Sequence, residues 1–118
     1  MVEKDLSLKD LDNFYSTEKY YNIFGVNVTD GVKYAMDNGY SWAVTDAVAI
    51  IKMQQAVRKE EFVAIELKLI SNGGAMIVYT DGNRNILYEQ EYKITDAQKE
   101  IKFYYTKAGS VMCLPMEY

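Results

Sequence analysis

The apolar residues of this sequence change their spacing after Glu60, and no other feature constrains the fold as much. Before Glu60 they recur every three or four residues, which places them along one side of an α-helix. After it they alternate with polar residues, as at Val63, Ile65 and Leu67, which places them on one face of a β-strand. With 118 residues, the chain has the length of a single domain. We therefore predict one α+β domain over residues 1–118.

Helical spacing predicts two or three helices in the first half of the chain. A short one is expected over residues 7–14. A second begins at Thr29 or Asp30, whose side-chain oxygens can accept hydrogen bonds from the first free backbone N–H groups. It ends at residues 38–39, where a glycine can turn left-handed. A longer and more buried helix follows over residues 41–58.

Alternating spacing predicts an antiparallel sheet in the second half. Asn72-Gly73 and Asp81-Gly82 separate the strands, because these pairs tolerate the positive φ of tight turns. Strands are expected over residues 63–69, 75–80, 85–93, 101–105 and 111–114. The aromatic segment 14–25 has no clear period and is expected to be irregular or extended. The predicted fold is two to three N-terminal helices packed on a C-terminal antiparallel sheet of four to five strands.

The residue inventory excludes several kinds of active site. The sequence holds no histidine and one cysteine, Cys113. A Ser-His-Asp or Cys-His nucleophile, a zinc site made of several His or Cys residues, and an intramolecular disulfide are therefore impossible within one chain. We expect no metal and no cofactor, and we expect Cys113 to be a small buried hydrophobic residue.

Charge and hydropathy narrow the range of partners. Lysine and arginine number 13 against 17 aspartate and glutamate residues, a net charge of -4, so nucleic-acid binding is not favoured. The longest uninterrupted apolar run covers residues 47–51, which is far shorter than the roughly 20 residues of a membrane span. The first residues are acidic and unlike a secretory signal. We expect a cytoplasmic protein without a membrane span.

Several segments carry a resemblance to a known family. They are Tyr20-Tyr21, Thr29-Asp30-Gly31-Val32-Lys33-Tyr34, the stretch from Trp42 to Ala49, Gln54 and Asp81-Gly82-Asn83. Over about residues 14–118, the chain resembles a family of small bacterial and phage proteins that is catalogued as a domain of unknown function. The resemblance implies a β-rich second half and an occurrence on phages and mobile elements. It implies no activity, and the residues around Tyr40 are less bulky than the family pattern.

Four residues are candidates for a pocket near the long helix. Trp42 and Asp46 lie one helical turn apart and share a face. With Asp30 and Tyr34 from the preceding helix they would form an aromatic wall and two carboxylates, which can act as acid and base when their pKa values differ. We favour the structural alternative, in which Trp42 lies in the core, Asp30 caps a helix and Asp46 accepts hydrogen bonds from a buried tyrosine hydroxyl or a backbone N–H.

Tyrosine is unusually frequent, at 11 of 118 residues. Alternation must place some of the strand tyrosines on the outer face of the sheet, and we expect Tyr79 or Tyr104 there beside Glu89, Glu91 and Lys102. Exposed tyrosines are typical of protein interfaces. The structural alternative is that tyrosine fills the core in place of phenylalanine, which occurs only 4 times.

Two hypotheses of different classes follow. The first is a non-enzymatic protein-binding module that recognises another protein and forms a homodimer. The family resemblance makes a phage or mobile-element inhibitor of a host defence complex one version of it. The second is a small-ligand-binding protein or hydrolase built on Asp30, Tyr34, Trp42 and Asp46. We favour the first hypothesis, so enzymatic activity is left open but not favoured.

Overall fold

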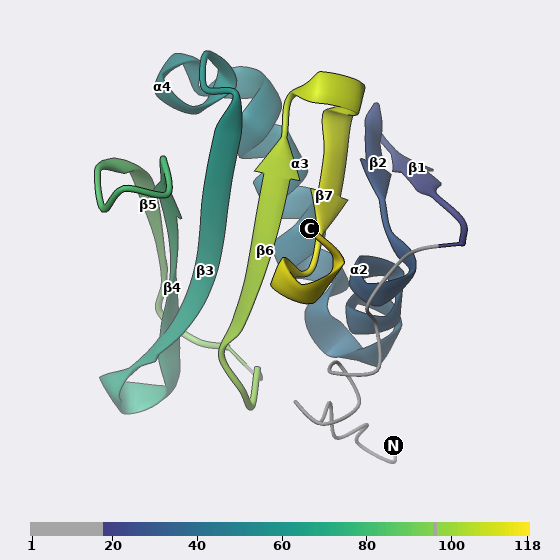
Figure 1. The fold of residues 1–118 in the computed structure, drawn as a ribbon. Helices are drawn as coiled ribbons and strands as arrows, with labels where there is room; N and C mark the ends of the chain where they lie inside the picture. The colour runs from purple at the N-terminus through teal and green to yellow at the C-terminus, as the bar shows by residue number, and fades with distance from the viewer. Residues whose placement is uncertain (1–17, 96) are drawn as a thin grey trace.

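A seven-stranded mixed sheet forms the centre of the molecule (Figure 1). The computed structural model describes residues 18–95 and 97–118, and the sheet is formed by these residues. Its strands are β1 (Tyr21–Ile23), β2 (Val26–Val28), β3 (Phe62–Ile70), β4 (Gly74–Thr80), β5 (Ile86–Tyr92), β6 (Ile101–Thr106) and β7 (Val111–Cys113). Their order across the sheet is β1-β2-β7-β6-β3-β4-β5. The pair β2–β7 is parallel, and the other neighbouring strands are antiparallel.

The helices follow one another between β2 and β3 and cover one face of the sheet (Figure 1). They are α2 (Asp30–Ala35), the π-helical turn η1 (Met36–Tyr40), α3 (Ser41–Met53) and α4 (Gln55–Arg58). The kink inside η1 occurs at Asn38 and Gly39, where the φ of glycine is 104°. The predicted stop at residues 38–39 is therefore a kink that lets α2 and α3 take different directions. Short 3-10 turns are η2 (Ser71–Gly73), η3 (Ala108–Ser110) and η4 (Pro115–Glu117).

The core lies between the helices and the sheet face that they cover, which we call the inner face. This face carries Val63, Ile65 and Leu67 of β3, with Tyr79 of β4 and Phe103 of β6, and each is at most 2% exposed. The helix α3 adds the predicted apolar side, namely Ala43, Val44, Ala47, Val48, Ile50 and Ile51. Each large aliphatic side chain buried here contributes about 1.5–3 kcal/mol relative to an exposed one.

The predicted α+β class is confirmed, but the predicted arrangement is wrong. The helices lie in the middle of the chain after β1 and β2, and the sheet has seven strands of mixed direction among the described residues rather than four or five antiparallel ones. Two physical reasons explain the error. β1 and β2 have three residues each, too few to show a period of two. The parallel pairing sets Asn27 opposite Val111, a contact that local spacing cannot reveal.

Two further predictions concern the helices. The helix expected over residues 7–14 lies outside the described residues. Within the described part of the chain, every helix is too short or too polar to cross a membrane.

The start of α2 is held by a carboxylate from the other end of the chain, an arrangement we call the Glu117 clamp. One oxygen of Glu117 accepts from the Thr29 hydroxyl at 2.5 Å and from the Leu114 N–H at 2.8 Å. The other oxygen accepts from the Gly31 N–H at 3.0 Å. Thr29 also donates its own N–H to the Met112 carbonyl at 3.1 Å, and its hydroxyl accepts from the Val32 N–H at 3.4 Å as the N-cap. A helix start and the turn after β7 are thereby joined by charge-assisted hydrogen bonds.

Gly31 makes this close approach possible. A Cβ atom at this position would lie 2.5 Å from Leu114 Cδ1 and 2.7 Å from Glu117 Oε1, both well inside contact distance. Close packing therefore explains the glycine of the Thr29-Asp30-Gly31 segment, because any side chain there would push the C-terminal turn away from α2.

We predict that Gly31→Ala lowers the free energy of unfolding by about 1–3 kcal/mol, the usual cost of overpacking. Urea unfolding followed by circular dichroism measures the loss. If the clash with Glu117 is the cause, Gly31→Ala and Glu117→Ala combined cost less than the sum of the two single changes, since the contact is shared. Strict additivity, or a loss for Gly31→Ala below about 0.5 kcal/mol, would contradict the clamp.

Candidate functional site

The face of the sheet opposite the helices, which we call the open face, contains a hollow of about 390 Å³. Its walls come from β3, β6, the turn between β4 and β5, and the last residue of the described chain. The lining residues are Phe62, Ala64, Asp81, Gly82, Asn83, Lys102, Tyr104 and Tyr118. This volume suits one or two side chains of a partner, or a small ring-sized ligand.

Three rings form an aromatic cluster at the hollow: Phe62, Tyr104 and Tyr118. The centroids of Phe62 and Tyr104 are 5.0 Å apart, those of Phe62 and Tyr118 are 5.4 Å apart, and those of Tyr104 and Tyr118 are 5.5 Å apart. All three pairs meet edge to face, which is a favourable geometry for aromatic rings. The cluster is not closed off from solvent, because Tyr118 is 69% exposed.

Register and the C-terminal turn bring these rings together. Ala64 of β3 lies opposite Tyr104 of β6, so Phe62, two residues before Ala64, shares the open face with Tyr104. The turn η4 begins at Pro115 and reverses the chain after β7, and the Tyr118 N–H donates to the Pro115 carbonyl at 3.3 Å. In Figure 1 this turn lies in front of the sheet, on the side away from the helices.

The hollow is lined by one negative side chain, Asp81, and one positive side chain, Lys102, and the two make different contacts. The Asp81 carboxylate accepts from the Asn83 N–H at 2.8 Å, the Asn85 N–H at 3.3 Å and the Asn85 side-chain amide at 2.7 Å. The side-chain hydrogen bond from Asn85, followed by the backbone bond from Asn83, lowers the pKa of Asp81. Asp81 is therefore an ionised residue that orders its own turn.

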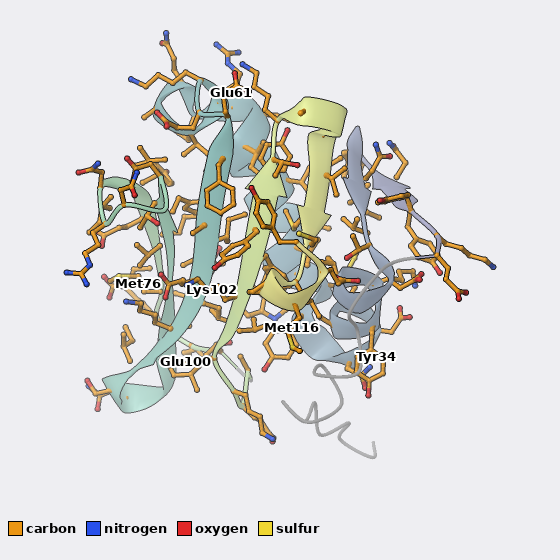
Figure 2. The ribbon with its side chains drawn as sticks, viewed as in Figure 1. Tyr34, Glu61, Met76, Glu100, Lys102 and Met116 are labelled. Atoms are coloured by element: carbon orange, nitrogen blue, oxygen red, sulfur yellow. The ribbon has the colours of Figure 1, made fainter. Side chains whose placement is uncertain are left out.

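Lys102 is the cation of the hollow (Figure 2). Its ammonium lies 5.5 Å from the centroid of the Tyr104 ring, a cation–π contact. It forms no ion pair within 4 Å with the residues that the structure describes. The hollow therefore offers apolar ring surface beside a positive charge.

Of the two tyrosines expected on the outer face, Tyr104 lies there and Tyr79 does not. Tyr79 is 0% exposed on the inner face, opposite Ile65 of β3. Its hydroxyl donates to the Gln90 side-chain oxygen at 2.7 Å, and burial raises the pKa of Tyr79 well above its ordinary range. The expectation for Tyr79 is wrong because it shares the face of Ile77, whose side chain is in the core.

Trp42 and Asp46 do lie together, at the strand β5. The Tyr92 hydroxyl donates to Asp46 Oδ2 at 2.7 Å, and the Trp42 and Tyr92 rings meet edge to face at 5.1 Å. Burial, followed by this hydrogen bond to Asp46, raises the pKa of Tyr92. The contact of Asp46 is the one that the structural alternative predicted, a hydrogen bond from a tyrosine hydroxyl.

Asp30 and Tyr34 belong to a different part of the molecule. Asp30 Oδ2 accepts from the Glu18 N–H at 2.8 Å and the Lys19 N–H at 3.4 Å, just before β1. Because β1 and β5 are the two ends of the sheet, the contacts of Asp30 and Asp46 lie at opposite ends. Tyr34 is labelled in Figure 2 beside α2, on the same side as β1. The N-cap of α2 is Thr29, and Asp30 is the first residue of the helix.

The sequence prediction placed Lys102 on the outer face beside Tyr104, but it did not name Phe62 or Tyr118 as site residues. Lys102 followed from alternation, since it lies two residues from Tyr104 on the same strand. The position of Phe62 needs the register of β3 against β6, and the position of Tyr118 needs the geometry of η4. No local sequence pattern predicts either of these two positions.

Metal binding gains no support from the geometry. In residues 18–95 and 97–118, no three His, Cys, Asp or Glu side chains are grouped so that they could hold a metal ion. Cys113 is buried and free, as predicted.

Comparison with known proteins places the chain in a family. The model of a family of unknown function, DUF6876, matches residues 5–118. The chain belongs to DUF6876. A search of curated proteins and a search of solved structures gave no match. Membership in DUF6876 confirms the resemblance to a family of unknown function, and it brings no activity with it.

We predict that Cys113 resists alkylation in the folded protein. Burial, with a smaller effect of the nearby Glu117 carboxylate, raises the pKa of Cys113 from 9.0 to about 11. At pH 8 the folded protein therefore holds about a hundredfold less thiolate than the unfolded chain, and thiolate is the reactive form. Iodoacetamide labelling followed by mass spectrometry, with and without urea, measures the ratio of rates. Equal rates would contradict the burial of Cys113.

Proposed function

We propose that this chain is a non-enzymatic protein-binding module that uses the hollow on the open face. The observation that carries the proposal is the aromatic cluster of Phe62, Tyr104 and Tyr118 beside the cation of Lys102. Aromatic residues surrounded by polar ones are typical of the centre of protein interfaces. The carboxylate that lines the hollow, Asp81, is engaged by hydrogen bonds within its own turn.

The hollow also indicates the chemistry of the partner. Its ring edges suit an inserted aliphatic or aromatic side chain. Lys102 favours a carboxylate next to that side chain, because the Asp81 carboxylate is engaged by hydrogen bonds within its own turn. We propose a protein partner that presents an apolar side chain flanked by an acidic one.

A phage or mobile-element inhibitor of a host defence complex, acting in the cytoplasm, is one version of this proposal and stays a prediction. The alternative, a small-ligand binder or hydrolase built on Asp30, Tyr34, Trp42 and Asp46, gains no support from their contacts. Asp30 binds backbone N–H groups near β1, whereas Asp46 binds a tyrosine hydroxyl on β5.

A photo-crosslinking experiment in the native cell tests the proposal. Tyr118 is replaced by p-benzoylphenylalanine, and the control places the same residue at Phe24, which is 78% exposed in the turn between β1 and β2. We expect a protein crosslink from position 118 that is absent from position 24. Lys102→Glu weakens that crosslink at least about fivefold, and Lys59→Glu, an exposed change of the same charge outside the hollow, leaves it unchanged. Equal crosslinking from both positions would refute the hollow as the binding surface.

We also predict a homodimer at micromolar concentration, formed through the open face. Light scattering over a concentration series should give a mass approaching twice the 13.6 kDa of one chain. Tyr118→Ser, which removes an exposed ring without opening the core, should return the mass to that of one chain. A constant mass of one chain up to high micromolar concentration would contradict the dimer and leave the open face for another protein.

A further inference from the structure

The strand β5 leaves one edge of the sheet open. It pairs with β4 alone among the described strands, so the backbone groups along its other side have no strand partner there. β5 has seven residues, whereas β1 at the opposite end of the sheet has three. An edge of this length, with unpaired N–H and C=O groups, is a template on which another strand can add.

The side chains of β5 on the open face are acidic. Glu89 lies opposite Val78 of β4, and Glu91 lies opposite Met76. Both glutamates are exposed, and neither forms an ion pair within 4 Å with a described residue. Two carboxylates on one face of an edge strand favour positively charged side chains on whatever pairs with that edge.

The inner face of the same edge carries a third carboxylate. Asp46 is half-buried, and the Tyr92 hydroxyl is its hydrogen-bond partner in the described structure. The rings of Trp42 and Tyr92 stand beside it at a 70° angle to each other. A carboxylate flanked by two aromatic rings favours a cation, by charge and by cation–π attraction. The edge is therefore acidic on both faces of the sheet.

We propose that the β5 edge binds an extended basic segment of another protein, which adds to the sheet as a further strand. Its main chain pairs with the free backbone groups of β5. Lysine or arginine side chains at alternate positions face Glu89 and Glu91, and one on the opposite face reaches toward Asp46. This surface is distinct from the hollow lined by Phe62 and Tyr104, so the proposal does not rest on the proposed function.

Charge selects a basic partner over a second copy of this chain. Two copies of β5 paired antiparallel about Gln90 would set Glu89 of one copy opposite Glu91 of the other. Like charges directly opposite each other destabilise a strand pair, whereas opposite charges stabilise it. The glutamates thus oppose self-pairing and favour a segment with alternating positive charge.

The test uses synthetic peptides of about nine residues, since this length spans the edge. One peptide alternates lysine with valine and threonine, and its partner peptide has glutamate in place of lysine. Fluorescence anisotropy at low salt measures binding. We expect the basic peptide alone to bind the wild-type protein, and the double change Glu89→Lys with Glu91→Lys to weaken it at least about tenfold. No binding of the basic peptide would overturn the proposal.

A matched control keeps the change in net charge the same. Glu60→Lys with Glu61→Lys alters residues that precede β3, and Figure 2 shows Glu61 at the top of the molecule, away from the middle of β5. This variant should bind the basic peptide within about twofold of wild type, because the charges that pair with the peptide are intact. Equal weakening by both double variants would overturn the proposal in favour of diffuse attraction.

Three further measurements separate strand addition from other modes of binding. N-methylation of alternate peptide nitrogens removes donors from the ladder, so it should abolish binding, and unchanged affinity would overturn the proposal. Backbone NMR shifts on adding the basic peptide should concentrate on β5. Shifts concentrated on Phe62 and Tyr104 would overturn it while supporting the proposed use of the hollow. A wild-type mass that doubles, stays doubled in Tyr118→Ser and returns to one chain when Glu89 and Glu91 become lysine would assign the edge to self-pairing and also overturn it.

Discussion

The carboxylate of Glu117 connects the two layers of this molecule. It accepts hydrogen bonds from the Thr29 hydroxyl, the Gly31 N–H and the Leu114 N–H, so the start of the helical layer and the end of the sheet share one anchor. Since the same turn carries Tyr118 onto the open face, the anchor also positions one ring of the aromatic cluster. The geometry of the candidate site therefore depends on the contact between Glu117 and the start of α2.

The sequence correctly predicted the features that depend only on the spacing of residues within one strand or helix. The inner-face residues of β3 and the apolar side of α3 followed from periods of two and about 3.6, and the contact of Asp46 with a tyrosine hydroxyl followed from its place on a partly buried helix. Prediction failed where distant segments meet. Nothing in the spacing of residues 21–28 indicates that β2 lies beside β7. Likewise, no local pattern indicates that Phe62 lies beside Tyr118. Tyr79 was misplaced because a tyrosine can fill a core when its hydroxyl finds a partner such as Gln90.

The two surfaces proposed for binding share a physical origin. The inner face is filled by the helices, so what is left of the sheet for a partner is its open face and its long free edge. The hollow on the open face offers rings and a cation, whereas the β5 edge offers backbone groups and carboxylates. Because their charges are opposite, the two surfaces would select different segments, and one partner with an acidic and a basic stretch could occupy both.

The parallel pairing of β2 with β7 also determines when the protein can fold. Residues 29–110 separate β2 from its neighbour in the sheet, so the strand pair and the Glu117 clamp cannot form until residues 111–117 have been synthesised. Until then, β7 is not present beside β2, and Val26 and Val28 are not fully buried. Contacts between such distant segments slow folding and leave apolar strands exposed for longer. Folding of this sheet is therefore expected to wait for the synthesis of β7, and a truncated product lacking β7 would be prone to aggregate.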